Sequence, residues 1–337
     1  FMTFFSVLFG ASILLVSSGN NVKGLKIFKI HYRRMIILAC IGLLHLYYLW
    51  YGDILFIYAV MGMLAYPVRN TTAKFLLITA FLLLIINAAF SYLASAAIPH
   101  MSQTDIQELV IHWKPSSEAI EEEIIANQSN WIAQMDHRTH MATEMLFSGA
   151  FYYCRVLALM LIGMAMMKLN FFGERFSNRS LLLQAILCLL LGVLIIINRL
   201  NYNILNNFPI ESMFTQENYW GSLIMAYAYI CLIIVFCRFE VLNPIKSCLA
   251  QVGRLALTNY LAQTFICTFI FYGWGLGKFG TFERKEQLLL VICIWVIQIF
   301  FSVLWVKKFR YGPFEWLWRS LTYGSFYKLK NSNGKCY

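Results

Sequence analysis

The stretch from Tyr32 to Gly62, YRRMIILACIGLLHLYYLWYGDILFIYAVMG, decides the fold. Two apolar arms meet at a polar turn, residues 51–53, so the pattern predicts a helical hairpin within a membrane. Arg34 opens the first arm and His45 lies inside it. Ionisable side chains are costly at bilayer depth unless they face protein or a water-filled cavity. The hairpin is therefore the first place to look for a functional site.

Four ionisable residues of the hairpin form the candidate site: Arg33, Arg34, His45 and Asp53. Arg34 and His45 are separated by about three helical turns, which places them on one stripe roughly 16 Å apart. In the structural interpretation, Arg34 fixes the orientation of the helix in the membrane and His45 hydrogen-bonds a neighbouring helix. In the chemical one, Arg33 and Arg34 bind an anionic co-substrate, and His45 acts as a general base. Asp53 is a second catalytic candidate, although its position also suits a helix cap.

Composition indicates an integral membrane protein. Of the 337 residues, 60% are hydrophobic and 13% are charged, whereas a soluble domain carries about 25% charged residues. The net charge of +11 does not indicate nucleic-acid binding, because the basic residues lie between apolar segments, where lipid headgroups account for them. The nine cysteines occur singly, without zinc or redox spacing, and are interpreted as small core residues.

The apolar segments predict an all-α, polytopic helical membrane protein with about nine transmembrane helices. The alternation of lysine and arginine between them places residues 18–34 and 307–337 in the cytoplasm and 99–144 outside. Nine spans would leave the N-terminus outside, and the chain starts in an apolar stretch, so we expect ten in the intact protein. The predicted spans are 1–16, 35–50, 54–68, 75–97, 145–167, 181–197, 220–237, 255–274 and 288–306.

The outer segment 99–144 is acidic and rich in helix-forming residues. It predicts two amphipathic helices, at 104–113 and 117–135, separated by a break at Pro115. Such a segment is either a solvated cap or a lid over an outward-facing site. Its histidines and carboxylates match no zinc signature, so no metal site is predicted.

Polar residues interrupt the span predicted at 255–274. They must face protein, so they either hydrogen-bond neighbouring helices or line a substrate path. Arg155, near the outer end of its own span, also needs a partner, for which Asp53 and Glu144 are electrically suitable. The candidate substrate-path residues are Arg155, Arg254, Thr258, Asn259, Tyr260 and Gln263.

The C-terminal segment predicts a short interfacial helix. Pro313 suits its first position and Gly324 ends it. Phe314, Leu317 and Leu321 share one face, so the helix is expected to lie on the membrane surface as an anchor.

Several motifs together cover nearly the whole chain: FFSVLFGAS, RRM…GLLH…WYGDIL…YAVMG, VGRLALTNYLAQT, GLGKFG and RYGPFEWLWRSLTYG. With them the chain resembles the YeiB-like bacterial membrane proteins, defined by domain of unknown function 418. The resemblance implies a multi-pass protein of the bacterial cytoplasmic membrane. It implies N-terminal helices at 1–169, the defining domain at 170–330, a cytoplasmic tail at 331–337, and a further helix before the LFG motif.

The family is in turn distantly similar to transmembrane acyltransferases. Those proteins carry an arginine, ten residues and then a histidine, matched here by Arg34 and His45. Their later Gly…Leu…Tyr-Leu pattern commonly ends in histidine, where this chain has Gln263 instead. The matching residues of that pattern are Gly253, Leu257, Tyr260 and Leu261.

Three functions remain open at this point. The first is transfer of an acyl group from a cytoplasmic acyl-CoA, the one co-substrate expected, to an acceptor at or across the membrane. The second is transport of a small solute or lipid, and the third is a non-catalytic membrane role. Membrane lipids and a small-molecule or lipid substrate are the expected partners.

Overall fold

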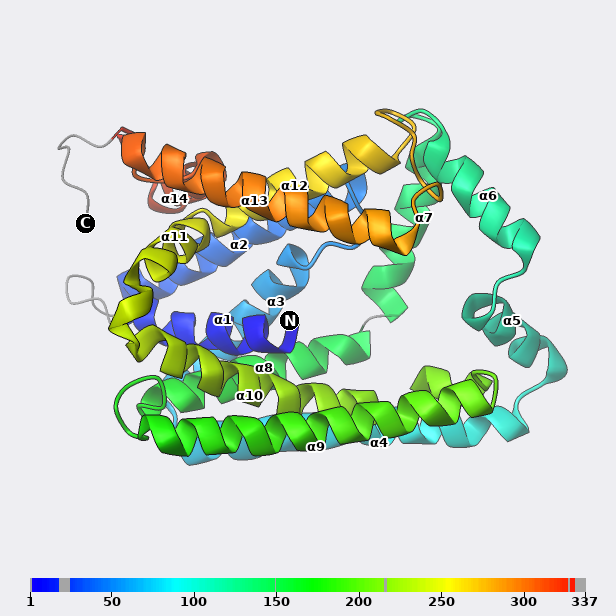
Figure 1. Cartoon of the computed structure of the whole chain (residues 1–337), viewed down its shortest axis with the longest axis horizontal. Coiled ribbons are helices and arrows are strands. Elements are labelled where there is room, and N and C mark those ends of the chain that lie inside the picture. Colours follow the sequence, from blue (N-terminus) through cyan, green and yellow to red (C-terminus); the bar gives the residue numbers. More distant parts are fainter. Residues whose placement is uncertain (1, 18–24, 149, 215–216, 327, 331–337) are drawn as a thin grey trace. The chain divides into compact units, whose positions relative to one another are not determined.

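The computed structural model describes residues 2–17, 25–148, 150–214, 217–326 and 328–330 (Figure 1). Predictions that fall on 18–24 or on the tail at 331–337 lie outside the described residues. The described chain is helical, and its one extended pairing is an isolated bridge between Phe309 and Lys330. The all-α prediction is confirmed.

The helices are α1 (Met2–Ser17), α2 (Leu25–Tyr48), α3 (Leu55–Ala65), α4 (Ala73–Ala97), α5 (Gln103–Trp113), α6 (Ser117–Gln128), α7 (Gln134–Ser148), α8 (Ala150–Lys168), α9 (Asn178–Leu205), α10 (Glu217–Arg238), α11 (Asn243–Arg254), α12 (Ala256–Phe271), α13 (Arg284–Lys308) and α14 (Pro313–Tyr323).

The chain forms two compact units, each assembled from segments that are not contiguous in sequence. The first unit comprises residues 1–21, 61–119 and 149–239. The second comprises residues 22–60, 120–148 and 240–337, and therefore contains both α2 and α12.

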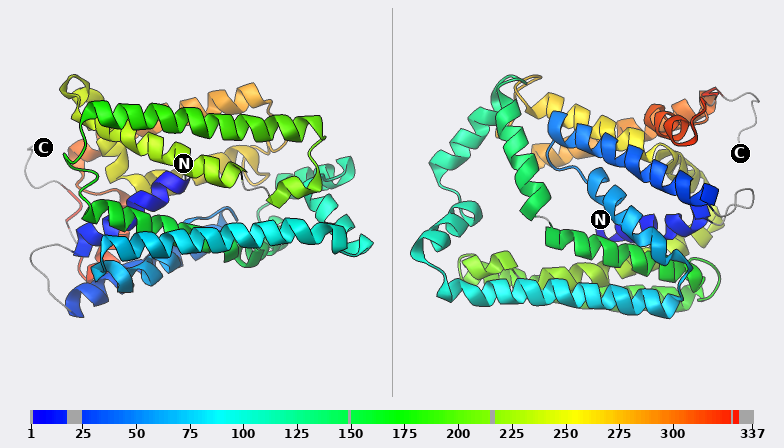
Figure 2. Two further views of the ribbon diagram at one scale, coloured as in Figure 1. Left: turned by 90° about the horizontal axis from the view of Figure 1, so that it is seen from below. Right: turned by 180° about the vertical axis from the view of Figure 1, so that it is seen from behind.

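In the first unit, α1 packs against α8 through two close backbone approaches. A Cβ atom added at Gly10 would lie 2.0 Å from the Met160 carbonyl oxygen, and one added at Gly163 would lie 1.8 Å from that of Val7. Only glycine fits at these positions, as is typical of tightly packed membrane helices. On the same unit, α4 packs along α8, and α9 runs beside α10 (Figure 2).

In the second unit, α14 packs on α2 and on the start of α12, while α11 packs on α13. The α12–α13 contact is polar: Asn259 Nδ2 donates to Ser302 Oγ at 3.0 Å, and Gln298 Nε2 donates to the Asn259 carbonyl at 2.8 Å. All three side chains are buried. Interhelical hydrogen bonds of this kind satisfy groups that would be costly facing lipid.

Eight of the nine predicted spans each overlap one α-helix, and the ninth, 145–167, covers the end of α7 and most of α8. Not every helix is long enough to cross a bilayer. Four stretches are long and apolar enough: 73–100, 178–205, 284–308, and 210–238, of which residues 215–216 are not among those described. Counting α7 and α8 together as one span would make five. Because α1 and α12 fall short of the ~20 residues that a span needs, the number of spans stays a prediction.

The predicted helix at 117–135 is wrong in its extent. It divides into α6, which ends at Gln128, and α7, which begins at Gln134. The Asn130 side chain accepts the backbone N–H groups of Ile132 and Ala133, at 3.1 and 3.0 Å. Such local side-chain bonds compete with the helix and interrupt it.

Candidate functional site

His45 and Asp53 form a buried pair where α2 ends and α3 begins. His45 Nδ1 lies 2.9 Å from Asp53 Oδ1, and the two side chains are 1% and 0% exposed. The other carboxylate oxygen, Oδ2, accepts the backbone N–H of Phe56 at 2.8 Å. Asp53 therefore caps α3, as one of its two interpretations predicted, and also lies against the histidine.

No described residue hydrogen-bonds the second ring nitrogen of His45, Nε2. Neither nitrogen makes an aligned hydrogen bond with a described residue, although Nδ1 lies close to the Asp53 carboxylate. A carboxylate beside Nδ1 favours the tautomer that carries the proton there. In that tautomer the Nε2 lone pair is free to accept a proton.

Tyr260 of α12 completes the cluster. Its hydroxyl donates to Asp53 Oδ1 and accepts the backbone N–H of Ile54, both at 3.3 Å. The Tyr260 ring lies 5.1 Å, centroid to centroid, from the imidazole of His45. Two segments distant in sequence thus converge on one carboxylate.

A glycine in α2 allows the start of α3 to come this close. A Cβ atom at Gly42 would lie 2.4 Å from the Phe56 backbone nitrogen and 2.9 Å from Asp53 Oδ2. Any side chain at this position would push α3, and with it the carboxylate, away from α2.

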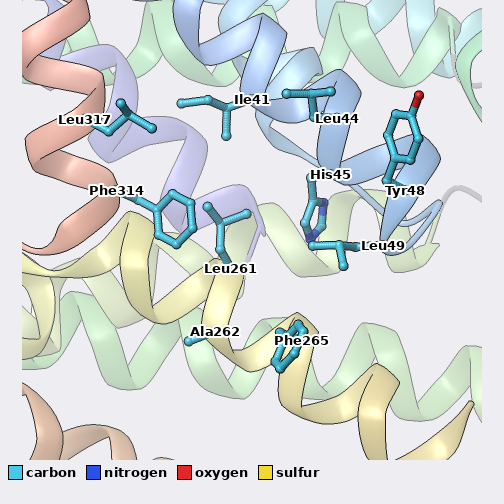
Figure 3. A pocket seen from close by; sticks show the side chains of 10 residues that line it. All are labelled: Ile41, Leu44, His45, Tyr48, Leu49, Leu261, Ala262, Phe265, Phe314 and Leu317. Carbon is cyan, nitrogen blue, oxygen red and sulfur yellow. The ribbon is translucent and has the colours of Figure 1, made fainter. Parts of the chain in front are cut away.

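An apolar pocket of about 530 Å³ adjoins His45 (Figure 3). Figure 3 shows the imidazole reaching from α2 toward Leu49 and Leu261, with Phe314 and Leu317 of α14 at the other side of the pocket. His45 and Tyr48 are the polar residues in its wall. The wall is formed by Ile41, Leu44, His45, Tyr48, Leu49, Leu261, Ala262, Phe265, Phe314 and Leu317.

Arg34 lies on α2 beside α14. Its guanidinium is 4.4 Å from the centroid of the Trp318 ring, and Trp318 Nε1 donates to the Arg34 carbonyl at 2.8 Å. The guanidinium forms no hydrogen bond or ion pair with a described residue, although it is partly buried. Its neighbour Arg33 is exposed. Both arginines therefore have donors available for an anion.

Thr258 is bound to α14 at the start of α12. Glu315 accepts the Thr258 backbone N–H at 2.9 Å and also the Thr258 hydroxyl. The same hydroxyl accepts the Phe314 backbone N–H at 3.2 Å. The carboxylate supplies the cap that the local sequence before α12 lacks.

Some of the other predicted substrate-path residues form hydrogen bonds with described residues and others do not. Asn259 joins α12 to α13, which fits the interhelical interpretation. Gln263 is partly buried and forms no hydrogen bond with a described residue. Arg254 is exposed and donates to the Arg310 carbonyl at 3.2 Å.

Arg155 belongs to the first unit, and its partners there are not the acids considered from the sequence. Its Nη2 donates to Ser222 Oγ at 2.8 Å and to the Tyr219 carbonyl at 3.2 Å. The guanidinium also lies 4.2 Å from the centroid of the Tyr219 ring. Asp53, one of the expected partners, is instead engaged with His45.

Three residues of the site were missed by sequence reasoning: Gly42, Glu315 and Trp318. Glycines in membrane helices often mark places where two backbones approach closely, so Gly42 could have been singled out. The roles of Glu315 and Trp318 depend on α14 packing against α2 and α12, and no local pattern encodes that contact.

Comparisons with known proteins relate the chain to one family and to two bacterial relatives. The family model described as "Protein of unknown function (DUF418)" matches residues 166–325. The chain is 31% identical to "Uncharacterized protein YeiB" of Escherichia coli (strain K12), over 96% of this chain and 81% of that protein. It is 27% identical to "Uncharacterized protein YxaH" of Bacillus subtilis (strain 168), over 96% of this chain and 79% of that protein. No solved structure matches the chain.

Long apolar helices and an all-helical fold define the chain as a helical membrane protein. It belongs to the YeiB-like, DUF418 family, as its motifs predicted.

Proposed function

We propose that this protein transfers an acyl group from a cytoplasmic acyl-CoA to an acceptor at or across a bacterial cytoplasmic membrane. One observation carries the proposal: a buried histidine has a carboxylate at Nδ1, no hydrogen-bond partner at Nε2 among the described residues, and a place in the wall of an apolar pocket. That is the arrangement a general base needs.

The chemistry assigns one role to each member of the pair. His45 Nε2 takes the proton of the acceptor's hydroxyl group while the hydroxyl oxygen attacks the thioester carbon of acyl-CoA. The new C–O bond forms, the C–S bond breaks, and the proton passes from His45 to the departing CoA thiolate. Asp53 orients the ring and stabilises the imidazolium in between. Tyr260 holds the carboxylate in place through its hydroxyl.

The arginines support the donor side of the proposal. The Arg34 guanidinium has no hydrogen-bond partner among the described residues, and it lies over the face of the Trp318 ring. A guanidinium can clamp phosphate with two parallel hydrogen bonds, which lysine cannot reproduce. We assign Arg33 and Arg34 to the phosphates of acyl-CoA.

The pocket supports an acyl-bearing ligand. Its wall on α2 begins at Ile41, two turns from Arg34, and ends at His45 and Tyr48. Leu317, also in the wall, adjoins the Trp318 that covers Arg34. Arg155, Arg254 and Gln263 remain predictions as substrate-path residues.

Transport of a lipid or small solute is the second candidate, and the same pocket favours it. An apolar pocket can hold a lipid chain without any chemistry at His45. A carrier would show binding without turnover, and a non-catalytic protein would show neither.

The binding step can be tested by calorimetry on the purified full-length protein with acetyl-CoA and longer acyl-CoAs. Arg34→Lys is expected to weaken binding at least tenfold, because the bidentate phosphate contact is lost. Arg179→Lys, an exposed arginine of α9 in the first unit, is the matched control and should leave binding unchanged. Absence of CoA-ester binding by folded wild-type protein would overturn the proposal and favour transport.

A further inference from the structure

Two side chains of the outer segment bind the last turn of α2. Trp131 Nε1 donates to the Tyr48 carbonyl at 3.1 Å, and Arg138 Nη1 donates to the same oxygen at 2.8 Å. The rings of Trp131 and Tyr48 also stack, with centroids 6.2 Å apart. The segment at 120–148 is thus hydrogen-bonded to the helix that carries His45.

Arg138 is an unusual residue to find at such a contact. It is 3% exposed and forms no ion pair with a described carboxylate. Its second amino group donates to Gln134 Oε1 at 3.0 Å. Burying a charge without a counter-charge is costly. Here the carbonyl groups at the C-terminal end of α2 carry a partial negative charge, which stabilises the Arg138 guanidinium in place of a carboxylate side chain.

The same segment also holds the chain that follows α12. The Gly273 N–H donates to the Asn127 carbonyl at 3.0 Å, and Gln128 Nε2 donates to the Phe279 carbonyl at 2.8 Å. A Cβ atom at Gly273 would lie 1.7 Å from the Gln128 carbonyl oxygen, so this contact requires glycine. Gln134 connects the two attachments by donating to the Asn127 carbonyl at 2.7 Å.

These attachments fix the two helices that build the candidate site. His45 lies in the turn that Tyr48 ends, and its carbonyl accepts the N–H groups of Leu49 and Trp50, each at 2.9 Å. Asp53 follows after a short loop and is held separately by Phe56. Any movement of the last turn of α2 therefore moves His45 relative to Asp53.

We infer that Arg138 is a positioning residue for His45: by capping α2 at the Tyr48 carbonyl, it holds the imidazole against Asp53. Insofar as His45 acts as a general base, the inference rests on the proposed function. Its structural content, the orientation and tautomer of the His45 ring, can be measured without any turnover.

The test uses full-length protein labelled with ¹⁵N-histidine, in which the His45 resonances are assigned by their loss in His45→Asn. Wild-type protein is expected to carry the ring proton on Nδ1. Arg138→Met should change the His45 nitrogen shifts toward a mixture of tautomers, and Arg138→Lys should restore them in part. If Arg138→Met does not fold, Arg138→Gln, which also removes the guanidinium, replaces it.

Arg238→Met is the matched control, because Arg238 also donates to a backbone carbonyl, that of Phe176, but in the first unit. It should leave the His45 signals unchanged. If transfer is observed, Arg138→Met should lower kcat at least tenfold with acyl-CoA affinity within twofold. Unchanged His45 signals in folded Arg138→Met or Arg138→Gln would overturn the inference, whether or not the wild-type protein transfers acyl groups.

Discussion

His45 Nδ1 lies 2.9 Å from Asp53 Oδ1, and the same aspartate caps α3 with its other oxygen. One carboxylate therefore serves two purposes, one electrostatic and one structural. Substitutions that separate these purposes offer the first test of the site.

Asp53→Asn should keep the cap and lose the charge, because asparagine is as good an N-cap as aspartate. We expect near wild-type thermal stability but a fall in acyl transfer of roughly 100-fold or more, since general-base catalysis contributes about 10²–10⁴. Asp53→Ala should lose the cap as well, at about 1 kcal/mol of stability. Equal thermal stability of the two variants would show that the cap contributes nothing.

Gly42→Ala should destabilise the second unit by about 1–3 kcal/mol, because the added Cβ would overlap the Phe56 backbone. Gly253→Ala is the matched control. A Cβ atom at Gly253, near the end of α11, meets nothing within 4 Å, and alanine favours a helix by up to about 1 kcal/mol. Thermal unfolding in detergent would measure both, and similar effects for the two glycines would contradict the close approach of α2 and α3.

The polar residues of α12 should respond differently to leucine. Asn259→Leu removes the bond to Ser302 and should cost about 1–2 kcal/mol, with the unpaired Ser302 hydroxyl contributing. Gln263→Leu should leave stability nearly unchanged, because Gln263 forms no hydrogen bond with a described residue. Chemical denaturation would detect the difference, and a larger effect at Gln263 would reverse this assignment.

The topology predicted from charge places the C-terminal tail in the cytoplasm. In a variant that keeps Cys336 as its single cysteine, a membrane-impermeant maleimide should label the protein only after the cells are permeabilised. Cys336 lies outside the described residues, so the test depends on sequence alone. Labelling in intact cells would contradict the predicted orientation.

The helices were largely predictable because apolar runs of this length leave few alternatives in a membrane. The pairing of Asp53 with His45 was less so, since it depends on the turn between them and on the space at Gly42. Tyr260 appeared only as a possible path residue, because its contact with Asp53 joins segments about two hundred positions apart. Arg138, Glu315 and Trp318 act through contacts between helices, and local composition does not encode those.

The most direct test of the account is transfer of a labelled acyl group from acyl-CoA to membrane extracts by purified full-length protein, comparing wild type with His45→Ala. Wild-type protein should produce a labelled acceptor. His45→Ala should produce none above background while it binds acyl-CoA with nearly unchanged affinity, because Arg34 and the pocket remain. Transfer by His45→Ala at the wild-type rate would contradict the central role given to this histidine.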